Sequence, residues 1–115
     1  MTKASSIIFV PFKGTAKLGV TLTQGQRFRL LRLELHLSAA PTTSGDFTMA
    51  LDAIQGDIFD NVIYKRDLSV GSVKDLLIPF GEGWEYEKDD KIDIAYTNAD
   101  AKTWGMRAVL ELLEK

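Results

Sequence analysis

Hydrophobic and polar residues alternate along most of this chain. The clearest alternation lies toward the C-terminal end, where every second residue from Ile92 to Tyr96 is apolar. A second alternation runs from Trp104 to Leu112, after a segment of small and polar residues typical of turns. We therefore predict a hairpin of two long strands from Asp90 to Leu112, with an apolar face that needs a second layer to cover it.

The strongest single strand pattern runs from Phe28 to Leu37. From Leu31 onward its leucines occupy every second position, and charged or polar residues occupy the positions between them. Phe28 and Leu30 have the opposite phase, so we predict a bulge near Leu30–Leu31. We expect the next alternating segment, Phe47 to Ala53, to pair antiparallel with this strand.

The remaining segments have shorter patterns. Further strands are expected at Ile7–Phe12, at Ala16–Thr23, within Ile58–Asp67 where Val62–Arg66 reads as buried, and at Asp75–Phe80. Gly81 to Asp90 is expected to form an acidic connection that exposes two aromatic residues. Met106 to Lys115 has apolar residues three or four apart, which fits a helix, but the alternation from Trp104 favours a strand.

Short strands at roughly ten-residue spacing, with almost no helix, indicate the fold class. We predict an all-β protein, a single-domain antiparallel β-sandwich over residues 1–115 that is jelly-roll-like, with seven to eight strands. Residues 1–12 are either an N-terminal arm or an edge strand. In the first case Ile7–Phe12 adds a strand to a neighbouring subunit, and in the second it belongs to its own sheet. Pro11 suits an edge because proline cannot donate to a strand ladder.

Composition and charge exclude several classes of function. The 115 residues are 45% hydrophobic and 26% charged, which is ordinary for one folded domain. A net charge of -2 gives no general attraction to nucleic acid or to anionic lipid. The absence of cysteine excludes disulfides and thiolate metal sites. The apolar run before Pro11 is too short for a signal peptide core or a membrane span, so we expect synthesis in the cytoplasm.

The sequence offers no catalytic constellation. His36 is the single histidine, and its place in a strand between two leucines predicts a side chain that faces solvent. The motifs of a nucleophile elbow, a phosphate-binding loop and a dinucleotide fold are absent. We therefore predict no catalytic residues, no cofactor and no enzyme activity.

Two groups of carboxylates leave a calcium site open as an alternative. They are Asp57 with Asp60, and Asp89 with Asp90 and Asp93. Calcium takes six to eight oxygen ligands, which loop carboxylates can supply. Neither group has the spacing of a calcium-binding loop, and adjacent aspartates in a turn also keep a strand edge soluble. We predict no metal.

The aromatic residues suggest one binding hypothesis. Trp84, Tyr86 and Trp104 could together form a stacking platform for sugars, because rings with a polar tip commonly bind the faces of sugars. Alternatively, Trp104 belongs to the core and Trp84 plugs the open end of the sandwich. The basic residues Arg27, Arg29 and Arg32 are interrupted by Glu34, so we interpret them as a solvated strand face or a subunit contact.

Several segments resemble small β-sandwich virion structural proteins of bacteriophages, of the head decoration, knob or fibre-associated type. These segments are Arg32–Pro41, Phe47–Asp52, Tyr64–Leu68, Gly83–Asn98 and Trp104–Met106. The resemblance implies a virion component with no enzymatic role. It also implies self-association, for example as a homotrimer, or contacts with other virion proteins, for which Arg32 and His36 are candidate contact residues.

Two hypotheses of different classes therefore stand. The first is a structural protein located in the virion that self-associates or docks on a viral lattice. The second is a carbohydrate-binding module that uses exposed aromatic residues. A sandwich supports either role, so the fold alone does not decide between them.

Overall fold

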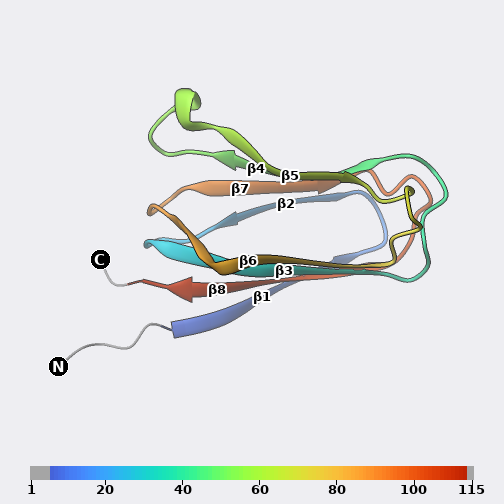
Figure 1. Cartoon of the computed structure of the whole chain (residues 1–115), viewed down its shortest axis with the longest axis horizontal. Helices are drawn as coiled ribbons and strands as arrows, with labels where there is room; N and C mark the ends of the chain where they lie inside the picture. Colours follow the sequence, from blue (N-terminus) through green and yellow to red (C-terminus); the bar gives the residue numbers. More distant parts are fainter. Residues whose placement is uncertain (1–5, 114–115) are drawn as a thin grey trace.

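The computed structural model describes residues 6–113, which form two four-stranded antiparallel sheets packed face to face (Figure 1). The first sheet has the order β1 (Ser6–Gly14), β8 (Trp104–Leu112), β3 (Phe28–Leu37) and β6 (Asp75–Tyr86). The second sheet has the order β2 (Leu18–Thr23), β7 (Lys91–Tyr96), β4 (Asp46–Asp52) and β5 (Asn61–Asp67). A short 3-10 turn, η1 (Asp57–Phe59), projects from the β4–β5 connection.

Strand pairing is nested from the ends of the chain inward. β1 pairs with β8, β2 with β7, β3 with β6 and β4 with β5, all antiparallel. The pairs β3–β8 and β4–β7 then join these ribbons into two sheets. One long hairpin folded over on itself in this way is a jelly roll. The predicted fold class, with eight strands, is confirmed.

The core lies between the sheets and follows from the alternation of the strands. Leu33, Leu35 and Leu37 of β3 are almost fully buried, as are Phe47 and Met49 of β4. The register of β3 shifts between Leu30 and Arg32 against both of its neighbours, which confirms the predicted bulge. The bulge lets Phe28 and Leu30 also point inward although they have the opposite phase.

The predicted strand partners were wrong in two places. β7 and β8 do not form a hairpin, since they lie in different sheets, and β3 does not pair with β4. The connection between β7 and β8 contains two left-handed residues, Asn98 and Ala101, and carries the chain from one layer to the other. Alternation identifies the buried face of a strand but carries no information about which strand lies beside it.

Three other predictions about elements need correction. Gly81 to Tyr86 is not a connection, because β6 continues through it to Tyr86 with positive φ at Gly81 and Gly83. The segment Val62–Arg66 is not buried, because β5 is the edge of its sheet and Val62 is 60% exposed. The strand expected at Asp75–Phe80 is therefore longer than predicted, since it runs on to Tyr86.

Two alternatives were left open at the chain ends. In the described residues β1 pairs with β8 from Ser6 to Gly14 and forms an edge of the first sheet. The C-terminal segment is the strand β8 and not a helix. Residues 1–5 and 114–115 of these two predictions lie outside the described range. Between residues 6 and 113 there is no helix of the length and apolar character that crossing a bilayer requires.

Candidate functional site

The outer face of the first sheet, which lies away from the second sheet, is a candidate surface. Its side chains come from alternate positions of β1, β8, β3 and β6 and form four cross-strand rows. In strand order the rows are Lys13, Gly105, His36 and Asp75; Pro11, Arg107, Glu34 and Leu77; Phe9, Val109, Arg32 and Pro79; and Ile7, Glu111, Arg29 and Glu85. We refer to these residues as the outer face. Charged residues occupy much of its middle, and apolar residues of β1 and β6 flank them.

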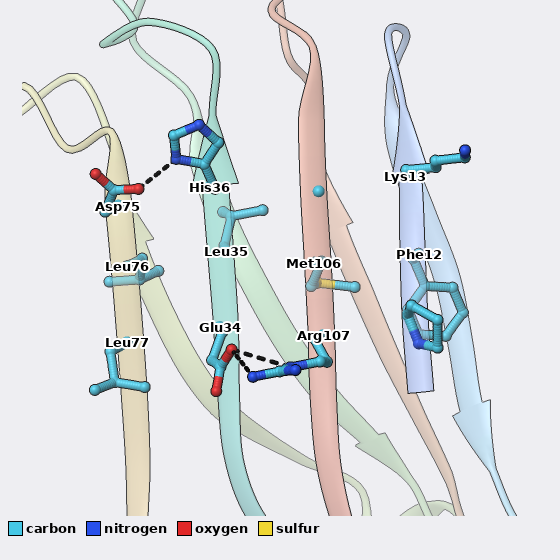
Figure 2. A pocket seen from close by; sticks show the side chains of 12 residues that line it. Phe12, Lys13, Glu34, Leu35, His36, Asp75, Leu76, Leu77, Met106 and Arg107 are labelled. Atoms are coloured by element: carbon cyan, nitrogen blue, oxygen red, sulfur yellow. Dashed lines mark hydrogen bonds and ion pairs between the residues drawn. The ribbon is translucent and has the colours of Figure 1, made fainter. Parts of the chain in front are cut away.

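A hollow of about 750 Å³ lies on the outer face and spans all four strands (Figure 2). Its floor includes Gly105, where an added Cβ would meet no atom within 4 Å. Lys13 and His36 stand beside Gly105 in the same row, and Glu34 and Arg107 follow in the next row. The missing side chain of one central glycine therefore opens this surface.

Ion pairs fix the long side chains around the hollow. The Nε and Nη2 atoms of Arg107 donate to Oε1 of Glu34 at 3.1 and 2.9 Å, and Arg32 Nε donates to Oε2 of the same carboxylate at 2.7 Å. The hydrogen bond from Arg32, with a further contribution from Arg107, holds the pKa of Glu34 below its ordinary value. The guanidinium carbon of Arg107 lies 4.7 Å from the ring centre of Phe9, a cation–π contact.

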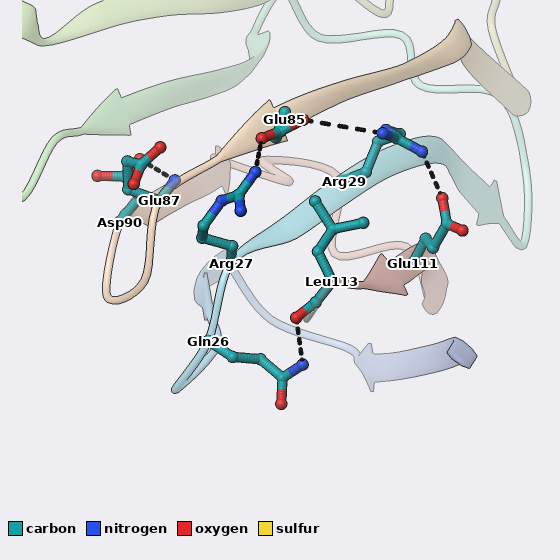
Figure 3. A network of polar contacts seen from close by, with 8 residues as sticks. All are labelled: Gln26, Arg27, Arg29, Glu85, Glu87, Asp90, Glu111 and Leu113. Carbon is teal, nitrogen blue, oxygen red and sulfur yellow. Dashed lines mark hydrogen bonds and ion pairs between the residues drawn. The ribbon is translucent and has the colours of Figure 1, made fainter. Parts of the chain in front are cut away.

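A second polar network lies at the end of the sheet where β3 begins (Figure 3). Arg29 donates to Glu111 at 2.6 Å and lies 3.7 Å from Glu85, which also pairs with Arg27. The Arg27 hydrogen bond lowers the pKa of Glu85. All three arginines of the predicted basic row are therefore paired with glutamates. This surface offers alternating charges and not the uniform positive potential that a nucleic acid requires.

His36 lies on the outer face as predicted and is exposed. Its Nδ1 contacts a carboxylate oxygen of Asp75 on the neighbouring strand β6 (Figure 2), and the two side chains are 61% and 68% exposed. This places both groups in solvent beside the hollow. The contact joins strands β3 and β6 at the surface, where polar contacts between exposed side chains stabilise only weakly.

The predicted aromatic platform is not assembled. Trp104 and Tyr86 are 5% and 8% exposed, so only Trp84, at 47%, reaches solvent. The indole Nε1 of Trp104 donates to the carbonyl oxygen of Ala16 at 2.9 Å. Tyr86 packs against Phe28, and burial raises its pKa to about 12. Both residues follow the inward phase of their strands, so the alternative that placed Trp104 in the core is confirmed.

In the two carboxylate groups considered for calcium, Asp60 and Asp90 accept backbone amides and Asp93 accepts a side-chain hydroxyl. Asp60 accepts the amide hydrogen of Ala53 at 2.8 Å, and Asp90 accepts those of Ile54 and Glu87 at 2.8 and 2.9 Å. Asp93 accepts the hydroxyl of Thr21 at 2.8 Å. Within the part of the chain that the structure describes, no three acidic or histidine residues are grouped so that they could hold a metal ion.

Sequence reasoning missed two parts of the candidate surface. The hollow was missed because its floor is a glycine in an otherwise regular strand, although an isolated glycine at an outward position is a usable signal. The apolar margin on β1 was missed because Ile7 and Phe9, 58% and 52% exposed, were read only as part of a short apolar strand. Only the pairing of β1 with β8 brings them beside the charged rows.

Comparisons with known proteins find a similar fold in a solved structure. No family model matches the sequence, and no curated protein matches it. Among solved structures, the chain is similar to a chain of the acidic stable capsid structure of Helicobacter pylori bacteriophage KHP30. The TM-score is 0.59 at 14% sequence identity, and the match covers 100% of this chain and 92% of the other. At this identity the similarity establishes a shared fold over the whole length of the chain.

Proposed function

We propose that this protein is a non-enzymatic structural component of a bacteriophage virion, a capsid decoration, knob or fibre-associated subunit. It acts through self-association or by docking on the viral lattice. The observation that carries this proposal is the full-length similarity of its fold to a chain from a phage capsid structure. A jelly roll is common in capsid proteins, and fold alone does not assign function, so the surface must also suit assembly.

The outer face has the composition of a protein contact. Apolar residues at its two margins, among them Phe9 and Leu77 at 52% and 61% exposure, offer area that a partner can bury. The ion-paired middle offers charges of both signs, which fix the register of a contact more than its strength. The hollow above Gly105 provides a recess into which a partner side chain can fit.

Two measurements test the proposal. The first is a search for peptides of this chain in density-purified particles of the phage that encodes it, by quantitative mass spectrometry. We expect a fixed copy number relative to the other capsid proteins. A protein that is abundant in the lysate but lost from purified particles would contradict a virion role.

The second measurement is the mass of the purified protein by light scattering, across a wide concentration range. A stable trimer or higher cyclic assembly is the result expected for self-association. A strict monomer would exclude self-association and leave docking on the lattice, which the particle analysis tests independently.

A further inference from the structure

A second recess lies on another side of the molecule, where the sandwich is open between two edge strands. β5 ends the second sheet and β6 ends the first, and neither is covered there by a further strand. A groove of about 330 Å³ follows this opening. One wall is formed by Tyr64 and Arg66 of β5. The other is formed by residues of β6, among them Phe80 and Trp84. Grooves of this size with apolar walls and a few polar groups are typical of small-ligand sites.

The ring of Trp84 is fixed in position by a neighbouring ring and remains accessible in this groove. Its ring centre lies 4.7 Å from that of Phe80 at an interplanar angle of 61°, an edge-to-face contact. Phe80 is itself buried at 6% exposure, whereas Trp84 is 47% exposed. The contact therefore fixes the indole against the core and leaves apolar ring surface open to a ligand.

Arg66 is the one charged side chain among the described residues that line the groove. Of the five arginines, Arg27, Arg29, Arg32 and Arg107 each have a glutamate oxygen within 4 Å. In residues 6–113, no carboxylate lies within that distance of Arg66, and its guanidinium forms no hydrogen bond there. A guanidinium left without an acid beside an exposed indole is suited to a carboxylate brought by a ligand, which it can bind through two parallel hydrogen bonds.

Tyr64 adds a second polar group to the wall of the groove. Its ring packs edge-on against Phe47 of the core, with ring centres 6.2 Å apart at 64°. Among the described residues, its hydroxyl group has no hydrogen-bond partner. The ring is thus anchored, and the hydroxyl group is able both to donate and to accept a hydrogen bond from a ligand.

We propose that this groove binds a carboxylate-bearing sugar residue of a glycan. The apolar C–H face of the sugar ring stacks on Trp84, its carboxylate pairs with Arg66, and Tyr64 hydrogen-bonds to a ring substituent. One guanidinium is matched to a single anionic group, and the net charge of -2 disfavours a polyanion. This proposed site differs from the aromatic platform expected from the sequence. Trp84 belongs to both, but its partners in the groove are Arg66 and Tyr64 and not Tyr86 and Trp104. It does not depend on a virion role.

The test is a titration followed by the indole N–H signals in ¹⁵N-labelled protein. The probes are 3′-sialyllactose and lactose, which differ by one acidic sugar. The two tryptophans give two signals, and Trp104 is the internal control because its buried N–H is bonded to Ala16. We expect 3′-sialyllactose to shift the Trp84 signal with a Kd on the order of millimolar, as is typical of one small site. Lactose should bind at least tenfold more weakly.

Matched variants assign the selectivity to Arg66. Arg66→Met should weaken binding of 3′-sialyllactose at least tenfold, whereas Lys65→Met, with the same charge change at the adjacent position, should not alter it. Lys65 is paired with Asp46 and does not line the groove. Trp84→Phe should retain part of the affinity. Circular dichroism verifies the fold of each variant, and both changes on β5 lie at exposed positions of an edge strand.

Three results would overturn the proposal. The first is the absence of any Trp84 shift with 3′-sialyllactose and also with D-glucuronate, a second acidic probe. The second is equal affinity for lactose and 3′-sialyllactose, which would remove the role of the carboxylate. The third is an equal loss of binding in Arg66→Met and Lys65→Met, which would reduce the effect to net charge.

Discussion

Single side chains hold the loops at the end of the sandwich where β3 ends. Asp100 accepts the backbone amides of Thr42 and Thr43 at 2.8 and 3.0 Å and the Thr43 hydroxyl at 2.6 Å. Asp67 likewise accepts hydrogen bonds from Ser44, Gly45 and Ser69. These bonds favour the charged form, so the pKa of Asp100 falls to about 2 and that of Asp67 also falls well below its ordinary value. Each carboxylate ties two connections together.

The pH dependence of stability should therefore change in Asp100→Asn. A pKa lowered by folding gives stability that is present above the ordinary value of 3.8 and is lost as the pH falls toward about 2. The melting temperature of the wild-type protein should fall across this window. The melting temperature of Asp100→Asn should be lower than that of the wild type at neutral pH and should fall less as the pH decreases. Melting curves from pH 6 to pH 2 measure both effects. Asp57→Asn, at an exposed position in η1, is the control, and equal pH profiles of the two variants would contradict the assignment.

Asn98 is a buried polar residue whose hydrogen bonds are all made within the chain. Its Nδ2 donates to the carbonyl oxygens of Ala16 and Lys102 at 2.9 and 2.8 Å, and its Oδ1 accepts the Lys102 amide at 2.9 Å. It has φ of 53°, a left-handed conformation that asparagine tolerates better than most residues. The residue thereby connects the β7–β8 loop to the β1–β2 loop.

Asn98→Ala should lower the free energy of unfolding by about 3 kcal/mol, since three hydrogen bonds at about 1 kcal/mol each are lost. Urea unfolding measures the change. Ala101, which lies in the same loop with φ of 51°, provides a control of opposite sign. Ala101→Gly should stabilise the protein, because glycine removes a strain of roughly 1–2 kcal/mol that exceeds its added unfolded-state entropy. A loss below 1 kcal/mol in Asn98→Ala would show that the loop rearranges.

Several residue environments were predictable from the sequence and others were not. The alternation placed His36 outward without reference to any partner strand, whereas it left Trp104 open between the core and the sugar platform. Arg66 and Trp84 come together only because β5 and β6 are the edges of facing sheets. Nothing in a local pattern indicates that two edges face each other, so the groove could not be predicted.

At the scale of elements, glycines explain why β6 was predicted too short. Gly83 has φ of 107°, and a Cβ there would overlap the side-chain stem of Arg29 and lie 2.9 Å from Leu31. The glycines let β6 follow the bulge of β3 and resume pairing at Trp84 with Leu30. A run of glycines and acidic residues in a sequence is typical of a loop. Here the glycines form an irregular part of β6 that lies opposite the bulge of β3.

Gly83→Ala should therefore destabilise the protein by roughly 2 kcal/mol or more, from backbone strain together with the steric overlap. Gly25→Ala is the matched control, because a Cβ at Gly25 meets nothing within 4 Å and its φ is not positive. We expect the control to stay within 0.5 kcal/mol of the wild type, as surface changes of this kind usually do. Equal unfolding free energies for the two variants would show that the bulge adapts to a side chain.

At the scale of the molecule, the buried faces were predictable but the nested pairing was not. Each alternating strand needs a second layer, and this requirement predicts a sandwich. The pairing of β1 with β8 joins the two ends of the described chain, and only the jelly-roll topology makes this contact. Pairing partners were assigned to neighbours in sequence because short connections are the common case. The same topology brings Ile7 and Phe9 onto the outer face.

Two glycines allow the proposed contact surface to be tested without disturbing the core. Gly105 lies in β8 on the outer face of the first sheet, and Gly19 lies in β2 in the second sheet. At both positions a Cβ would meet no atom within 4 Å. Tryptophan favours strands, so Gly105→Trp and Gly19→Trp should both fold with melting temperatures close to the wild type.

The two variants should nevertheless differ in association. In Gly105→Trp the indole occupies the hollow of about 750 Å³ and excludes a partner side chain, so the dissociation constant of the assembly should rise at least tenfold. Gly19→Trp should associate as the wild type does. Light scattering over a dilution series measures both constants, and particle incorporation replaces it if the protein is monomeric alone. Equal behaviour of both variants and the wild type would exclude the hollow as part of the contact and move the search to the exposed apolar residues around η1, Ile54, Ile58 and Phe59.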